Sequence, residues 1–245
     1  MSLRTSYTLI APFYDWVIGP ALHHARKKSL ARLSTAGTAH ILLNGIGSGL
    51  DLPLLPPGHR YTALDLTRAM LNKALPRSGN LDLQWTQGDS QRLPFRNEAF
   101  DHVLLHLILA IVPDTRAALR EAARVVKPGG RLYVLDKFLR PGESAWLRRL
   151  VNPLVRRIAT RTDVVFENAL AGVSELRMIT DEPALARGWF RMITLEKTAG
   201  QDLPDSSSSS RRGQVSQTMP TSSPTAAATS IKNHINPSIT SLSTP

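Results

Sequence analysis

Short apolar runs recur between residues 40 and 136, and each is bounded by turn residues and followed by a segment of different periodicity. Apolar runs without polar alternation are typical of parallel strands that are buried on both faces. The predicted strands cover residues 41–43, 61–66, 81–85, 100–109 and 131–136. The predicted helices cover residues 67–75 and 116–126. This alternation predicts an α/β fold in which helices cover both faces of a parallel sheet.

The predicted helices have recognisable ends. Thr67 precedes the first helix, and either Asp114 or Thr115 precedes the second. Side chains of these types accept hydrogen bonds from the free N–H groups at a helix start, so they are the expected N-caps. The Lys-Pro-Gly-Gly segment at 127–130 is expected to end the second helix, because proline and glycine do not continue it.

The first predicted strand ends in three glycines at alternate positions, Gly45, Gly47 and Gly49. Without side chains, the backbone there can turn tightly and approach a ligand. The helix that follows is expected to be short, because Pro53 fits its first turn and the proline pair at 56–57 ends it. Its N-terminal amides would face the ligand. The pattern indicates a nucleotide-binding turn, and an ordinary glycine-rich loop between strand and helix is the alternative.

Polar side chains follow the other predicted strands. Asp65 ends the second strand, where it can accept hydrogen bonds from both hydroxyls of a ribose. Asp89 follows the third strand, where it can accept from an exocyclic amine such as that of adenine. His106 and Lys137 lie near the ends of the fourth and fifth strands. Ligands of such sheets bind beyond the carboxyl ends of the strands, so these residues are expected to meet at one site.

The spacing of the motifs distinguishes two kinds of nucleotide binder. A dinucleotide-binding turn would need glycine at position 50, where this chain has Leu50. Six motifs instead follow one another along residues 40–136: Gly45-x-Gly-x-Gly49, Asp65-Leu-Thr-x-x-Met-Leu71, Gly88-Asp89 with Leu93-Pro-Phe95, Phe100-Asp-x-Val103, Val112-Pro-Asp114 and Lys127-Pro-Gly-Gly130. In these motifs the chain resembles the class I S-adenosylmethionine-dependent methyltransferases of the "type 11" kind, which include quinone-biosynthesis methyltransferases and bacterial phosphatidylethanolamine N-methyltransferases. A shorter resemblance to the phosphatidylethanolamine enzymes covers residues 13–20.

The resemblance implies a Rossmann-like sheet of seven strands, mostly parallel, in which the last strand is antiparallel. Residues 175–180 and 189–196 are the expected final hairpin. The resemblance also implies an enzyme with S-adenosylmethionine as its cofactor. By this resemblance, the three glycines would pass under the methionine part of the cofactor, Asp65 would hold its ribose, and Asp89 with Ser90 would contact its adenine. The expected cofactor contacts are Asn44, Gly45, Gly47, Gly49, Asp65, Leu66, Asp89, Ser90 and His106.

One position departs from the family pattern. The family usually has an acidic residue two positions before the first glycine, where it supports the amino-acid end of the cofactor, and this chain has Leu43. Asn44 would replace part of that support. Because of Leu43, a noncatalytic binding protein with the same fold is an alternative hypothesis.

Three residues are candidates for a catalytic role, namely Tyr14, His106 and Lys137. A sulfonium donor already carries a good leaving group, so alignment of the acceptor and exclusion of water provide most of the catalysis. His106 would accept a proton from an amine or hydroxyl acceptor, and the alternative is that it only packs or forms hydrogen bonds. Tyr14 would cover the cofactor, or it is a packing residue.

A helical insertion is expected at about residues 140–170, where apolar residues recur at helical spacing between arginines. Trp146 would contact acyl chains or a lipid surface, while Arg149 and Arg156 would bind a phosphate. The alternative is a helix that covers the core and exposes its arginines to solvent.

The sequence divides into three segments. Residues 1–39 are expected to form an N-terminal amphipathic helical segment that covers the active site, and residues 40–198 are expected to form the methyltransferase domain. Residues 199–245 are rich in serine and threonine and lack the apolar surface needed to offset the entropy of ordering, so a disordered tail is predicted. The basic residues at 26–32 either lie on a solvated helix face or meet lipid head groups.

The charge limits the partners of the protein. A formal net charge of +11 favours anionic surfaces such as a membrane with acidic lipids. Nucleic acid is disfavoured because the chain has few aromatic residues and no recognised RNA-binding appendage. The absence of cysteine excludes thiolate metal sites, and no metal site or obligate protein partner is expected. The expected location is the cytoplasm, with or without attachment to the inner face of the membrane.

The favoured hypothesis is therefore methyl transfer from S-adenosylmethionine to a small or amphiphilic acceptor. N-Methylation of a lipid of the phosphatidylethanolamine type is the preferred case. Methylation of a quinone, a phenol, a thiol or another small metabolite is the first alternative, and noncatalytic binding is the second.

Overall fold

The computed structural model describes residues 22–33, 37–138, 164–185 and 188–199. The predictions made for Tyr14, Trp146, Arg149, Arg156 and almost all of the 199–245 tail lie outside this part of the chain. The same holds for the predicted insertion up to residue 163.

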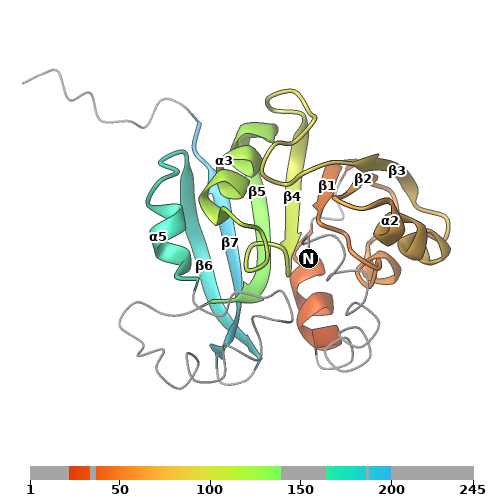
Figure 1. The fold of residues 1–245 in the computed structure, drawn as a ribbon, viewed down its shortest axis with the longest axis horizontal. Coiled ribbons are helices and arrows are strands. Elements are labelled where there is room, and N and C mark those ends of the chain that lie inside the picture. Colours follow the sequence, from red (N-terminus) through yellow and green to blue (C-terminus); the bar gives the residue numbers. More distant parts are fainter. Residues whose placement is uncertain (1–21, 34–36, 139–163, 186–187, 200–245) are drawn as a thin grey trace, which may run out of the picture. The chain divides into compact units, whose positions relative to one another are not determined.

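The described residues form a seven-stranded sheet with the order β3-β2-β1-β4-β5-β7-β6 (Figure 1). Strands β1 to β5 run parallel to one another, whereas β7 runs antiparallel to both of its neighbours, β5 and β6. The mostly parallel sheet with an antiparallel last strand confirms the predicted fold class. The strands are β1 His40–Asn44, β2 Arg60–Asp65, β3 Asp82–Gln87, β4 Phe100–His106, β5 Val126–Lys137, β6 Leu176–Leu185 and β7 Phe190–Lys197.

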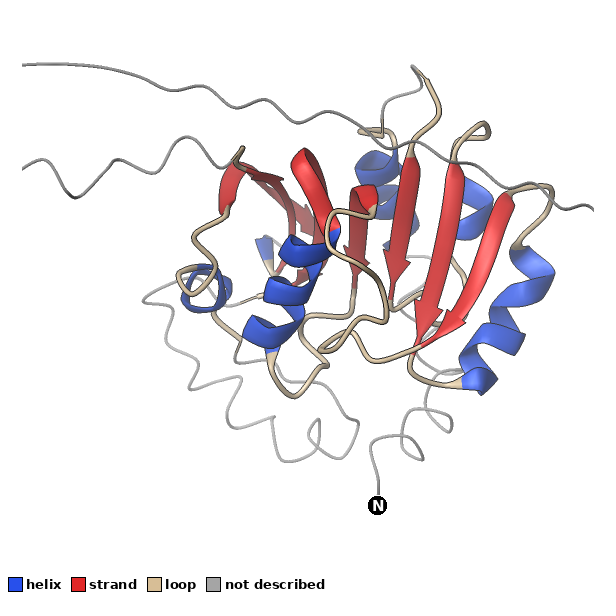
Figure 2. Cartoon of the chain, turned by 90° about the horizontal axis from the view of Figure 1, so that it is seen from above, coloured by secondary structure: helices blue, strands red, loops and turns tan. Residues whose placement is uncertain are grey.

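Helices lie on both sides of the sheet (Figure 2). Because side chains of a strand alternate between faces, Leu42 and Leu43 enter two different cores. The core on the Leu42 side is covered by α3 (Thr115–Val125) and α5 (Phe166–Leu170). The core on the Leu43 side is covered by a helix over residues 22–30, by the 3-10 turn η1 (Leu52–Leu54) and by α2 (Arg68–Ala74), which continues into η2 (Leu75–Arg77).

The helix starts follow the sequence closely. Thr67 accepts a hydrogen bond from the Met70 N–H and caps α2, as predicted. Of the two candidates for α3, Asp114 is the N-cap, since its carboxylate accepts from the Ala117 N–H. The helix expected after the glycines is the single turn η1, with Pro53 in its first positions.

Three strand boundaries differ from the prediction by three residues or more. Strand β6 ends at Leu185 rather than at residue 180. Strand β4 ends at His106 rather than at residue 109, because Leu107 adopts a left-handed backbone with φ of +60° and the chain turns there. The N–H of Leu107 still donates to Leu135 O, which fixes this turn against β5. Helix α3 ends at Val125, within one residue of the predicted end, but strand β5 begins at Val126 and already includes the Lys-Pro-Gly-Gly segment, five residues before the predicted start.

The N-terminal helix is held to the far end of the sheet by its basic residues. Lys28 and Arg32 both form ion pairs with Glu182 of β6, at 2.8 and 2.6 Å. Arg32 also donates to the hydroxyl groups of Thr180 and Thr194. Lys28 and Arg32, two of the cations that were candidates for binding lipid head groups, are therefore paired within the protein.

Candidate active site

The glycine turn is tied to the neighbouring strand. The N–H groups of Gly45 and Ile46 both donate to Leu64 O at 2.9 Å. A Cβ atom at Gly45 would lie 2.6 Å from Ile108 Cδ1, and one at Gly49 would lie 2.8 Å from Ala74 Cβ. Both glycines also have a left-handed backbone, with φ of +79° and +82°. Packing and backbone conformation therefore require glycine at these two positions.

Gly47 differs from its neighbours because a Cβ atom there would meet nothing within 4 Å. Its φ is +55°, and its N–H donates to Asp65 Oδ2 at 3.0 Å. The backbone at Gly47 therefore faces open space at the carboxyl end of β1, which is what a bound ligand requires.

Asp65 ends β2 beside this open space. Its Oδ1 accepts from the N–H of Thr67 at 3.0 Å, so the carboxylate holds the glycine turn and the start of α2 together. Burial raises the pKa of the Asp65 carboxyl, although hydrogen bonds from Thr67 and Gly47 act in the opposite direction. The next residue, Leu66, is 39% exposed despite its apolar side chain. An exposed apolar side chain next to a carboxylate at a strand end offers a surface suited to a planar ring; the ribose role of Asp65 and the cofactor contact of Leu66 stay predictions.

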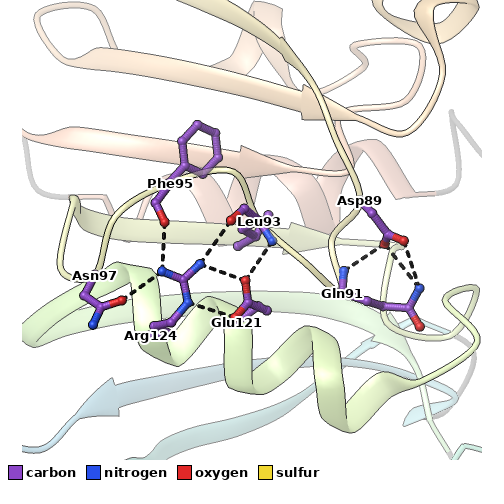
Figure 3. A network of polar contacts seen from close by, with 7 residues as sticks. All are labelled: Asp89, Gln91, Leu93, Phe95, Asn97, Glu121 and Arg124. Atoms are coloured by element: carbon purple, nitrogen blue, oxygen red, sulfur yellow. Dashed lines mark hydrogen bonds and ion pairs between the residues drawn. The ribbon is translucent and has the colours of Figure 1, made fainter.

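The loop that carries Asp89 follows β3. The Asp89 carboxylate accepts from the backbone and side-chain nitrogens of Gln91 (Figure 3). Ser90 is buried and donates to Asn44 Oδ1 at 2.6 Å, which links this loop to the end of β1. The strand order places β3, β2 and β1 side by side. Asp89, Asp65 and the glycine turn therefore lie at the carboxyl ends of three adjacent strands, as predicted.

Helix α3 supports the Asp89 loop from the side (Figure 3). Glu121 accepts from the Leu93 N–H at 2.7 Å, and Arg124 donates to the carbonyl oxygens of Leu93 and Phe95. Glu121 and Arg124 also pair with each other at 2.8 Å. Hydrogen bonds from Arg124 lower the pKa of Glu121 below its ordinary value, so the pair stays charged near neutral pH. The loop is thus fixed in position without a ligand.

Asn44 and Leu43 point to opposite faces of the sheet. Leu43 is buried in the core under the N-terminal helix, while Asn44 faces Ser90 on the other side. The side-chain nitrogen of Asn44 is buried without a hydrogen-bond partner. Its assistance to the amino-acid end of the cofactor stays a prediction, since its observed contact is on the adenine side.

His106 is part of a buried network at the end of β4. Its Nδ1 is hydrogen-bonded to Asp51 Oδ1 at 3.1 Å, and its Nε2 is hydrogen-bonded to Ser29 Oγ at 3.0 Å. Arg26 donates to the same Asp51 oxygen at 2.8 Å. Burial by itself would raise the pKa of Asp51, but the attraction of His106 and Arg26 outweighs it and holds the pKa below its ordinary value. A role of His106 as a general base stays a prediction, because both ring nitrogens already have partners.

Sequence reasoning did not find the other members of this network, which are Arg26, Ser29 and Asp51. Arg26 and Ser29 are buried on the face of the N-terminal helix that also carries Leu22 and Leu30. Buried polar side chains need a hydrogen-bonding partner. A serine and an arginine on an otherwise apolar helix face therefore indicate a buried polar network, and this pattern is visible in the sequence.

Asp136 and Lys137 end β5 and point to opposite faces of the sheet. The carboxylate of Asp136 accepts from the N–H groups of Ala110 and Lys137, at 3.0 and 2.8 Å. It therefore fixes the turn that follows His106. Burial lowers the pKa of Lys137, an effect in the direction that a catalytic amine requires, but its catalytic role stays a prediction.

The Asp136 carboxyl gives the stability of the protein a defined pH dependence. Burial raises its pKa to about 6, whereas an unfolded aspartate titrates at about 3.9. Asp136 therefore contributes to the unfolding free energy below the unfolded-state pKa of about 3.9, and this contribution is lost as the pH rises through the folded-state pKa of about 6. Relative to Asp136→Asn, the wild type is expected to lose on the order of 3 kcal/mol of unfolding free energy between pH 4 and pH 7.5. Urea unfolding of both proteins across this range measures the difference, and a difference that is independent of pH would contradict the assignment.

The sheet order is that of the class I methyltransferase fold, and the open backbone at Gly47 and the carboxylates at the ends of β2 and β3 lie at the edge where such a fold is expected to bind its ligand. The comparisons agree. A family profile described as a methyltransferase domain matches residues 42–134. A demethylmenaquinone methyltransferase of Mycobacterium sp. (strain KMS) is 30% identical over 184 residues, which cover 71% of this chain and 78% of the relative. A phosphatidylethanolamine N-methyltransferase of Cereibacter sphaeroides is 25% identical over 189 residues, which cover 75% of this chain and 92% of the relative.

Solved structures share the fold. A protein of Haloferax volcanii, solved in complex with the Trm112 methyltransferase activator, superposes with a TM-score of 0.62 at 20% identity, covering 79% of this chain and 98% of that one. An S-adenosylmethionine-dependent methyltransferase from Mesorhizobium loti superposes with a TM-score of 0.56 at 17% identity, covering 72% and 98%. The chain belongs to the S-adenosylmethionine-dependent methyltransferases. It is an enzyme, and S-adenosylmethionine is its methyl donor.

Proposed function

We propose that the protein methylates the amine of an amphiphilic acceptor, with a lipid of the phosphatidylethanolamine type as the preferred substrate. The observation that carries this choice is the match to a phosphatidylethanolamine N-methyltransferase along 92% of that relative. The match is 189 residues long, so it extends well beyond the cofactor motifs. The basic charge of the chain supports the same choice, because it favours a surface with anionic lipids.

The residues at the strand ends would divide the work as follows. The glycine turn, Asp65 and the Asp89 loop would hold the cofactor, which supplies an electrophilic methyl group on a sulfonium. The turn at Leu107 would border the acceptor, held in place by Asp136. An amine acceptor must lose its proton before it attacks, and His106 or Lys137 would accept that proton.

The contacts with the lipid would come from other segments. Trp146 would contact the acyl region, and Arg149 and Arg156 would bind the phosphate. Tyr14 would cover the reacting centre. Among the described residues, no helix is long and apolar enough to cross a membrane. We propose a membrane surface as the place of action because the basic charge of the chain favours anionic lipids.

The acceptor can be tested with labelled S-adenosylmethionine. Vesicles of phosphatidylglycerol that contain phosphatidylethanolamine are expected to become labelled on the ethanolamine nitrogen, and vesicles of phosphatidylglycerol alone are not. The enzyme with Asp65→Ala serves as the control for cofactor-dependent transfer. Label that enters only soluble metabolites, with none in the lipid, would reject this acceptor.

Demethylmenaquinone is the second candidate acceptor. The similarity to the demethylmenaquinone methyltransferase of Mycobacterium sp. (strain KMS) favours it, since the two chains are 30% identical and the match covers 78% of that relative. Adding demethylmenaquinone to the same vesicles decides between the two. Label in the quinone and none in phosphatidylethanolamine would establish the second candidate in place of the first.

A further inference from the structure

We infer that Arg26 and Asp51 bind the amino-acid end of the cofactor, with the guanidinium group on its carboxylate and the Asp51 carboxylate on its ammonium group. The inference rests on the methyltransferase assignment and is independent of the acceptor. The two side chains form a buried ion pair at 2.8 Å, and the residues are only 8% and 6% exposed.

The order of the strands gives the direction of the cofactor. Asp89 follows β3 and Asp65 is the last residue of β2, so the adenine and ribose would lie toward that side of the sheet. The rest of the molecule must continue over Gly47 at the end of β1, toward β4, which is next in the order β3-β2-β1-β4. At the end of β4, His106 is hydrogen-bonded to Asp51, which is paired with Arg26. The pair therefore lies where the amino-acid end of the cofactor arrives.

Both side chains retain unused hydrogen-bonding groups. The Nε of Arg26 is buried and has no partner. His106 and Arg26 both use Oδ1 of Asp51, and within the described part of the chain nothing donates to Oδ2. An ion pair buried in this way is costly unless its remaining donors and acceptors are satisfied. A zwitterion with one carboxylate and one ammonium group would satisfy both.

The order of contacts Asp51, His106, Ser29 is the same as in a hydrolase triad, but the geometry excludes that role. Ser29 is 0% exposed, so its hydroxyl group cannot reach a substrate. The remaining alternative is a purely structural one, in which the pair only fastens the N-terminal helix to the glycine turn. If the pair were only structural, its removal would weaken the binding of every ligand of the site equally. If the pair binds the amino-acid end, its removal would weaken only ligands that carry that end.

Calorimetric titration with two ligands provides the test. S-Adenosylhomocysteine carries the amino-acid end, whereas 5′-methylthioadenosine has the same adenosine and sulfur but lacks that end. Wild-type protein is expected to bind the first about 10- to 100-fold more tightly, the range of one or two hydrogen bonds between charged groups. In Arg26→Gln, this preference is expected to fall to within about 3-fold, while the affinity for 5′-methylthioadenosine stays the same.

Arg32→Gln is the matched control, because Arg32 also holds the N-terminal segment to the sheet but pairs with Glu182. It is expected to keep the wild-type preference. Parallel weakening of both ligands in Arg26→Gln would overturn the inference, as would a wild-type protein that binds both ligands equally. If Arg26→Gln does not fold, the same comparison in Asp51→Asn decides. Failure of the wild type to bind either ligand would instead contradict the methyltransferase assignment.

Discussion

Asp65→Ala is expected to weaken the binding of S-adenosylhomocysteine by about 100-fold or more. The carboxylate would lose its hydrogen bonds with the ribose hydroxyl groups, and hydrogen bonds to a charged group contribute about 1.5–3 kcal/mol each. The substitution also removes the acceptor of the Gly47 N–H and of both hydrogen bonds from Thr67. The glycine turn would therefore become less ordered at the same time as the ribose loses its partner.

Calorimetric titration measures this loss, and Asp82→Ala is its control. Asp82 lies at the other end of the neighbouring strand β3, where its exposed carboxylate is 3.7 Å from Arg60. The control is expected to bind S-adenosylhomocysteine as the wild type does. If Asp65→Ala bound the ligand within about 3-fold of the wild type, the ribose assignment would be wrong.

Gly47→Ala is expected to weaken cofactor binding by about 10-fold or more, because its methyl group would occupy the space over which the cofactor passes. The empty protein tolerates this methyl group sterically, since nothing lies within 4 Å of it. The only cost to the fold is that of an alanine in the left-handed region, about 1–2 kcal/mol. Cofactor binding should therefore be affected much more than stability.

Gly79→Ala is a closely matched control for this prediction. Gly79 has a φ of +53°, against +55° for Gly47, and its surroundings are equally open. Gly79 lies between η2 and the start of β3, so it precedes a strand, whereas Gly47 follows the end of one. Thermal unfolding is expected to show similar losses for the two variants, and titration is expected to show weaker binding for Gly47→Ala alone. Equal binding by both would mean that the cofactor does not pass over Gly47.

Much of the fold could be predicted because its signals are local. The short apolar runs, the capping role of Thr67 and the prolines after the glycine turn each act over a few residues, and the structure confirms them. The glycines and the carboxylates at the strand ends could be placed together for a related reason. Parallel strands bring their carboxyl ends to one edge, so the position of Asp65 and Asp89 follows from the fold class.

The missed features depend on contacts between distant segments. Strand β4 ends early because Leu107 turns against Leu135, a residue of another strand. The pairing of Arg32 with Glu182 joins residues that are 150 positions apart. The buried network around Asp51 unites the N-terminal helix, the glycine turn and the end of β4. No short motif contains these partners, so their charges appeared to be available for solvent or lipid.

The most direct test of the cofactor site is a crystal structure of the protein with S-adenosylhomocysteine. We expect the ribose hydroxyl groups on the Asp65 carboxylate, the adenine between Leu66 and the Asp89 loop, and the amino-acid end beyond Gly47 toward Arg26 and Asp51. An adenosyl group bound elsewhere, with the space over Gly47 still empty, would contradict this expectation.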